Sequence, residues 1–157
     1  MNNNIEFTCD IFIKASPKTV FGFLTEGEKV AQWFGEIVEI EGRNGGRFYV
    51  AASSGLHAAG KFTEVVPHEK VEFTWGGHDG IAAGATNVAV TLKPEDGGTR
   101  LSLRHYNIPT QEAADSYGEG WPKHALPLLK LVAEGGKTEE RCFRAAGGCE
   151  AAKSSAA

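Results

Sequence analysis

The chain has 157 residues, of which 41% are hydrophobic and 23% are charged, and it carries a formal net charge of -4 at pH 7. This length is typical of one domain, and the composition excludes a disordered or fibrous chain. The negative charge and the lack of any run of Lys or Arg exclude nucleic acid as the expected partner. No stretch approaches about 18 apolar residues and no secretion signal is visible, so we expect a cytoplasmic protein without membrane insertion.

The N-terminal part of the chain predicts one strand and two short helices. Residues 5–13 carry an apolar side chain at every odd position, which is typical of a strand with one buried face. Ser16 can cap a helix and Pro17 suits its first turn, so a short helix is expected next. A capping-box pattern at residues 25–28 predicts a second helix, which is expected to end at Gly35.

The middle of the chain predicts a meander of antiparallel strands. From residue 36 to about 106 the sequence alternates in short runs separated by turn residues. Short connections such as Asp96-Gly97 force neighbouring strands to be antiparallel. Residues 76–84 are rich in glycine and predict a flexible loop. The six strands of this region are expected at residues 36–41, 46–52, 57–66, 70–75, 86–94 and 98–106.

The C-terminal part predicts one long helix and a tail. Apolar residues return at helical spacing after residue 109. Pro122 and Pro127 each remove a backbone donor, so we expect a kink or a late start near residue 120. Residues 136–157 lack a sustained apolar period and predict a polar, mobile tail behind a single domain of residues 1–135.

These elements predict an α+β domain in which a curved antiparallel sheet of six to seven strands wraps around the long C-terminal helix. Such a sheet is roughly 30 Å wide, whereas one helix covers about 10–12 Å. The remaining space must be packed by side chains or left as a cavity. Small residues at positions 58–60 favour a cavity, and aromatic residues from several elements would make it an apolar small-molecule site.

Several short motifs carry a family resemblance: Ser16-Pro17, Gln32-Trp33-Phe34, Gly45-Gly46, Gly60-x-Phe62, Val71-x-Phe73-Thr74-Trp75, Gly98-Thr99 and Gly120-Trp121. In this order they resemble the START-like (SRPBCC, helix-grip) superfamily, and its branch related to the activator of the heat-shock-protein ATPase in particular. The resemblance covers residues 5 to 135 and implies a helix-grip fold. Members of the superfamily include lipid and hormone binders, aromatase/cyclase enzymes and hydrolases, so the fold alone assigns no chemistry.

Ten side chains are expected to line the cavity: Trp33, Phe34, Phe48, Phe62, Phe73, Trp75, His105, Tyr117, Trp121 and Leu128. His105 shares an inward strand face with Leu101 and Leu103. It is either a general base, a group that orients a ligand, or a buried histidine bonded to a neighbouring carbonyl. Trp33 and Phe34 form either a lid over the cavity or an anchor between helix and sheet.

Metal and nucleophile chemistry are not expected. The histidines lack the spacing of a zinc site, and no Gly-x-Ser-x-Gly motif is present, so we expect neither a metal nor another cofactor. The odd set of Cys9, Cys142 and Cys149 predicts reduced thiols. Cys9 falls within an apolar strand, where the pKa of its thiol should rise.

Three functions follow from these observations. The first is the binding, carriage or sensing of a small apolar molecule, aromatic or lipid-like. The alternative is a cyclase/aromatase-like or hydrolase-like enzyme that uses His105 as acid and base. The third is a co-chaperone-like module whose outer sheet face or tail docks a chaperone. The co-chaperone that names the branch has a further N-terminal domain, for which this chain has no room. An unpaired edge strand also makes a homodimer possible.

Overall fold

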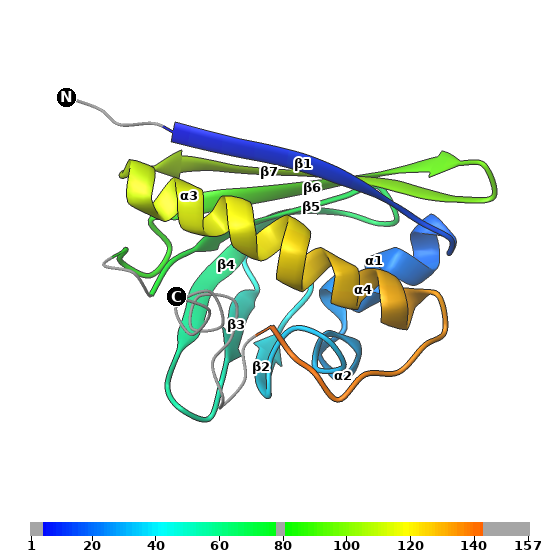
Figure 1. Ribbon diagram of the computed structural model, residues 1–157, viewed down its shortest axis with the longest axis horizontal. Helices are drawn as coiled ribbons and strands as arrows, with labels where there is room; N and C mark the ends of the chain where they lie inside the picture. The colour runs from blue at the N-terminus through cyan, green and yellow to red at the C-terminus, as the bar shows by residue number, and fades with distance from the viewer. Residues whose placement is uncertain (1–4, 78–80, 143–157) are drawn as a thin grey trace.

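The computed structural model describes residues 5–77 and 81–142. It contains seven strands joined in one sheet with the order β1-β7-β6-β5-β4-β3-β2. The sheet curves around the C-terminal helix, so the predicted α+β helix-grip architecture is confirmed (Figure 1). The elements are β1 (Ile5–Ile13), α1 (Pro17–Thr25), α2 (Gly27–Val30), β2 (Ile37–Ile40), β3 (Arg47–Ala51), β4 (His57–Val66), β5 (Lys70–Trp75), β6 (Thr86–Glu95), β7 (Gly98–Ile108), α3 (Gln111–Gly120), the π-helical turn η1 (Trp121–Ala125) and α4 (Leu126–Ala133).

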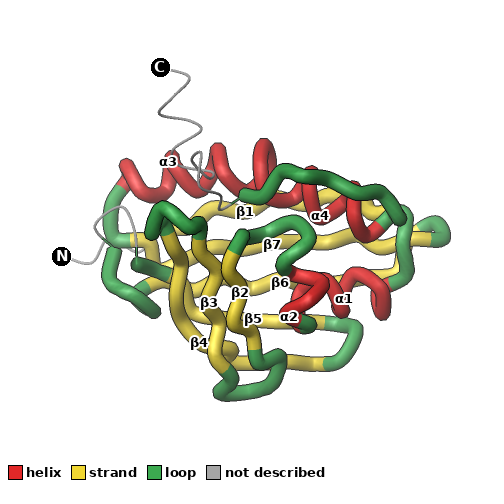
Figure 2. The backbone as a smooth tube through the Cα atoms, turned by 90° about the horizontal axis from the view of Figure 1, so that it is seen from below, coloured by secondary structure: helices red, strands yellow, loops and turns green. Residues whose placement is uncertain are grey.

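The sheet bends at β4, so that β2, β3 and β4 run across the direction of the other strands (Figure 2). The first half of β4 pairs with β3 and its second half pairs with β5. Gly60 lies between these halves, and a Cβ there would overlap the backbone carbonyl of Thr74. The small residue at position 60 therefore allows two strands to approach closely. It does not create the interior cavity that the sequence favoured.

The elements α3, η1 and α4 form one continuous helical rod (Figure 1). The rod begins at Gln111, where the Thr110 hydroxyl accepts a hydrogen bond from the N–H of Ala113, so the expected late start near residue 120 is wrong. The expected irregularity is present. Pro122 cannot donate a backbone hydrogen bond, and the N–H of Leu126 bonds to the carbonyl five residues earlier, which makes a π turn. No described helix has the length and apolarity of a membrane span.

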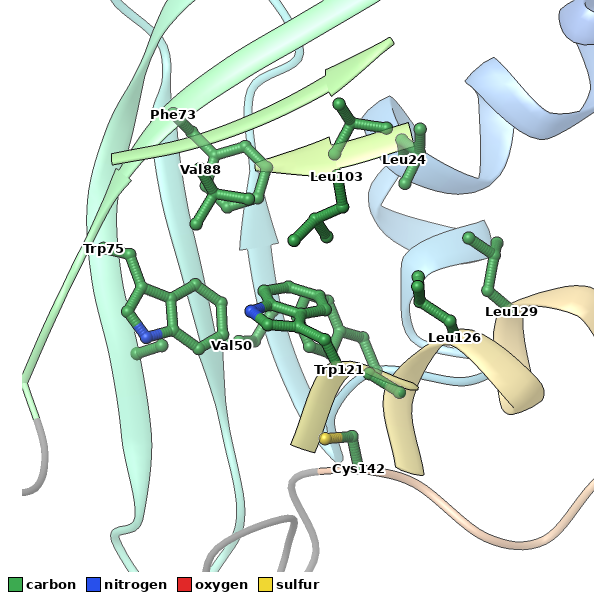
Figure 3. Packing of buried hydrophobic residues seen from close by; sticks show 14 of the residues in the cluster. Leu24, Val50, Phe73, Trp75, Val88, Leu103, Trp121, Leu126, Leu129 and Cys142 are labelled. Carbon is green, nitrogen blue, oxygen red and sulfur yellow. The ribbon is translucent and has the colours of Figure 1, made fainter. Parts of the chain in front are cut away.

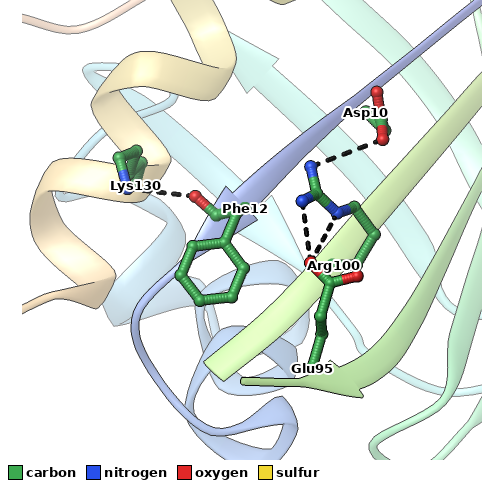
Figure 4. Close-up of polar contacts among 5 residues, drawn as sticks. All are labelled: Asp10, Phe12, Glu95, Arg100 and Lys130. Carbon is green, nitrogen blue, oxygen red and sulfur yellow. Dashed lines mark hydrogen bonds and ion pairs between the residues drawn. The ribbon is translucent and has the colours of Figure 1, made fainter. Parts of the chain in front are cut away.

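The free edge of β1 is covered near its C-terminal end by side chains of the helical rod. Lys130 Nζ donates to the carbonyl of Phe12 at 3.0 Å, as Figure 4 shows beside the ion pairs of Arg100. Glu134 accepts a hydrogen bond from the backbone N–H of Lys14 at 2.8 Å and lies 2.5 Å from Lys130 Nζ. These contacts satisfy edge groups that would otherwise be open to another strand.

The C-terminal segment returns from α4 to the core. Cys142 is buried, and its backbone N–H donates to the carbonyl of Trp33 at 3.1 Å. Arg141 and Cys142, which the sequence assigned to a mobile tail, thus contact the domain, whereas Lys137, Glu139 and Glu140 are exposed. The rest of that predicted tail, residues 143–157, lies outside the described residues.

The two cysteines in the described part of the chain differ in their redox state. Cys9 is a free thiol, and burial together with the charge of Asp10 raises its pKa to about 11, as its place in an apolar strand predicted. Cys142 is disulfide-bonded, so the prediction of a reduced thiol is wrong there. Cys149 lies outside the described residues.

The edge contact predicts a pH-dependent contribution to stability. The Lys130 ammonium and the Lys14 N–H hold the pKa of Glu134 below its ordinary value. A lowered pKa in the folded state stabilises the fold above the ordinary pKa, and this contribution is lost as the pH falls through the folded pKa. Glu134→Gln should lower the free energy of unfolding by about 0.5 kcal/mol at neutral pH.

Urea unfolding across the acid range measures this effect. The difference between wild type and Glu134→Gln should shrink to zero below the folded pKa. Glu139→Gln, at an exposed position of the following segment, is the control and should show no such difference. A difference that is the same at every pH would contradict the assignment.

Candidate functional site

An apolar pocket lies between the inner face of the sheet and the helical rod. Figure 3 shows side chains from the sheet, from α1 and from the rod that meet in this region. The space left for the centre of a water-sized sphere is about 10 Å³, which is about one water molecule. The cavity expected from the sequence is therefore closed in this conformation. The pocket wall consists of Leu24, Val30, Trp33, Phe34, Phe48, Phe73, Val90, Leu101, Leu103, Trp121 and Leu126.

The Phe34 ring occupies the centre of an aromatic cluster. It stacks on Trp33 with ring centroids 4.4 Å apart and an interplanar angle of 3°. Its centroid lies 5.8 Å from that of Trp75 and 5.7 Å from that of Trp121. Such contacts stabilise a cluster beyond the area that they bury. Phe34 is carried by the turn of residues 31–34 after α2, which we call the lid turn, so a short local segment supplies the ring at the centre of the cluster.

A buried polar network orients one wall of the pocket. Trp121 Nε1–H donates to His105 Nδ1 at 3.1 Å, and His105 Nε2 lies 2.8 Å from Thr86 Oγ1. The Thr86 hydroxyl donates to the carbonyl of Trp75 at 2.8 Å, so it can only accept from the imidazole. This assigns a neutral ring with its proton on Nε2. The Tyr117 ring stacks on the imidazole at 4.0 Å.

The network gives His105 a structural role. The residue is fully buried, and both of its ring nitrogens already have partners within the domain. A general base needs a nitrogen within hydrogen-bond reach of the substrate proton. Of the interpretations open from the sequence, this geometry favours the buried histidine, whose partners are a hydroxyl and an indole rather than a carbonyl.

The predicted site residues are distributed around the pocket in three ways. Five form part of its wall, namely Trp33, Phe34, Phe48, Phe73 and Trp121. Four are buried next to it, namely Phe62, Trp75, His105 and Tyr117. Leu128 is only partly buried and packs against the core from the rod.

Sequence reasoning missed the aliphatic part of the wall because it gave its weight to aromatic residues. The inward alternation of the two longest strands was a usable signal for Val90, Leu101 and Leu103. Leu126 depends on the π turn, which changes the face that the rod presents, so its spacing alone carried no signal.

The convex side of the sheet carries charged and small residues. We call this the outer sheet face, and it includes Thr8, Asp10, Lys70, Glu72, Ala89, Thr91, Ser102 and Arg104. Arg104 lies over the ring of Tyr106, whose hydroxyl donates to Glu72. Glu64 on β4 is exposed and pairs with Lys70 at 2.8 Å. Within the described ranges no three His, Cys, Asp or Glu side chains are grouped to hold a metal ion.

The polar network predicts that a substitution on the inner face of β6 destabilises the protein more than one on its outer face. Thr86→Val removes the hydroxyl that serves both His105 and the carbonyl of Trp75, and it should lower the free energy of unfolding by about 1–3 kcal/mol. Thr91→Val is the matched control, because that side chain lies on the outer sheet face of the same strand. Urea unfolding compares the two variants, and equal losses would contradict the role of the network.

Comparisons with known proteins agree with this fold. Residues 14–133 match the family model described as Activator of Hsp90 ATPase homolog 1-like protein, whereas no curated protein matches significantly. An AHSA1-like protein from Rhizobium etli is 31% identical, with 88% of this chain and 87% of that chain covered and a TM-score of 0.69. An HSP90 activator from Plasmodium falciparum is 22% identical, with 82% and 95% covered and a TM-score of 0.69. The Aha1 dimer from Colwellia psychrerythraea is 20% identical, with 85% and 99% covered and a TM-score of 0.70.

Proposed function

This chain belongs to the Activator of Hsp90 ATPase homolog 1-like family, and from that premise we propose that it binds a small, uncharged apolar molecule in the pocket that Phe34 fills. The observation that supports this proposal is the origin of the closing ring. Phe34 and its neighbour Trp33 come from the lid turn, Leu24 and Val30 come from α1 and α2, and the sheet and the helical rod supply the other wall residues. A local movement of one short segment would therefore open the pocket without disturbing either layer.

The energetics of such an exchange are favourable for an apolar guest. A ligand that takes the place of the Phe34 ring would regain the aromatic contacts that the ring makes with Trp75 and Trp121. Each further square ångström of apolar surface that the ligand buries contributes about 25 cal/mol. Trp121 is held by its bond to His105, so this part of the wall is already in position before the ligand arrives.

The wall also restricts the class of ligand. It contains no charged side chain, and a charged group inside it would lose its hydration without compensation. The indole N–H groups of Trp33 and Trp121 already donate to the carbonyl of Phe23 and to His105. These features favour an uncharged aromatic or lipid-like molecule.

Binding of a neutral fluorescent compound tests this function. The wild-type chain should bind N-phenyl-1-naphthylamine saturably, one to one, with a Kd on the order of 10 µM and quenching of tryptophan emission. Leu126→Phe adds bulk to the pocket wall and should weaken binding at least about tenfold.

Leu131→Phe is the matched control, because Leu131 is 42% exposed on the same helix, α4. It should bind the compound as the wild type does. The function would be rejected if the wild type showed no saturable binding, or if both variants bound equally well.

A second candidate is the docking of an Hsp90 chaperone. It is favoured by the family description and by the likeness to the HSP90 activator from Plasmodium falciparum. The charged outer sheet face, with Arg104 near its centre, is the surface that such a partner would contact.

Stimulation of the ATPase rate of an Hsp90 chaperone separates the two candidates. Under the docking function, Arg104→Glu should reduce this stimulation severalfold, because a reversed charge repels a matched partner. Leu126→Phe, which changes only the pocket, should leave it unaltered. A wild-type chain that gives no stimulation would exclude the docking function.

A further inference from the structure

The segment that follows the family-matched region contacts the lid turn, which carries two residues of the pocket wall, Trp33 and Phe34. The match ends at residue 133, and the chain then turns away from α4 and returns to the lid turn. We call residues 138–142 the strap. Figure 1 shows this part of the chain, in orange, as it passes from the end of α4 toward β2 and α2.

Arg141 joins the strap to the lid turn. Its Nε donates to the carbonyl of Ala31 at 2.5 Å. Its Nη1 donates to the carbonyls of Thr138 and Glu140, both at 2.8 Å, so the strap itself orients the guanidinium. Hydrogen bonds from a charged donor are stronger than those between neutral groups. Arg141 thus fixes the backbone at the first residue of the lid turn.

The neighbouring residue fixes the same turn at a second point. The backbone N–H of Cys142 donates to the carbonyl of Trp33 at 3.1 Å. The Cys142 side chain is 3% exposed and enters the core cluster from the C-terminal segment, as Figure 3 shows. Two backbone carbonyls of the lid turn are therefore held by the strap, and Phe34 follows the second of them directly.

We propose that the strap is a latch that holds the lid turn closed and so controls access to the apolar pocket; this inference rests on the proposed function. Entry of a ligand needs the open form of the lid turn, and the strap contacts the turn in its closed form. Contacts that stabilise only the closed form lower the fraction of open molecules. Apparent affinity falls in proportion to that fraction.

Two measurements on the full-length chain test the latch. Hydrogen–deuterium exchange without ligand reports opening of the lid turn, because the amides of Gln32, Trp33 and Phe34 bond to carbonyls of α2. Stopped-flow binding of N-phenyl-1-naphthylamine reports access to the pocket. Arg141→Ala should raise both the exchange rate of these amides and the association rate of the compound about tenfold or more.

Arg141→Lys keeps the charge but lacks the planar fork of donors that spans the strap and the lid turn, so it should give an intermediate effect. Lys137→Ala is the matched control, since it removes an exposed positive charge just before the strap. It should leave both rates at their wild-type values.

The outcomes separate the latch from the proposed function. Faster exchange and faster association in Arg141→Ala alone support both. Unchanged exchange in Arg141→Ala, or an equal change in Lys137→Ala, overturns the latch even if the compound binds. Faster exchange in a protein that never binds the compound supports the strap contact on the lid turn and overturns the pocket function.

Discussion

A seven-stranded sheet is about three times as wide as the single helix that it surrounds, and the space between them has to be filled. In this chain aromatic rings fill much of that space, together with aliphatic side chains from the strands, the short helices and the rod. These rings come from separate elements. Phe48 and Trp75 lie on strands, Trp121 lies on the rod, and Phe34 lies on the lid turn. The aromatic part of the wall is therefore supplied by segments that lie far apart in the sequence.

The same constraint explains why the interior contains a buried polar network. An indole in a dry core needs a partner for its N–H, and His105 supplies it for Trp121. The imidazole in turn needs an acceptor for its own proton, which the Thr86 hydroxyl provides. Trp121 is the first residue of the π turn, and Pro122 follows it directly. Each member satisfies the next, so the network orients the wall and engages both ring nitrogens of His105.

Much of the fold could be predicted from the sequence. Alternation along single strands placed all seven strands near their observed bounds, and Asp96-Gly97 does form a turn with positive φ at both residues. The start of the helical rod was left open, because Pro122 and Pro127 are compatible with either a kink or a late start, and the structure shows the irregularity within a rod that Thr110 caps. The site was predicted only in part. Aromatic residues identified the correct region, but whether Phe34 fills it depends on packing between distant elements.

The contacts of the strap could not be predicted from hydrophobic periodicity. Residues 138–142 have no apolar repeat. Within the described part of the chain the Arg141 guanidinium bonds to backbone carbonyls, which a pattern of side-chain types does not reveal. At Gly60 the sequence analysis predicted free space in the interior, whereas the missing side chain actually permits close contact with the backbone of Thr74.

The proposed function requires that a ligand can displace the Phe34 ring and take its position. A crystal structure of the chain with a neutral, naphthalene-sized compound measures this most directly. The account predicts the compound in the position of the Phe34 ring, in contact with Trp75 and Trp121, with the lid turn displaced. A compound bound only at the surface, with Phe34 still stacked on Trp33, would contradict it.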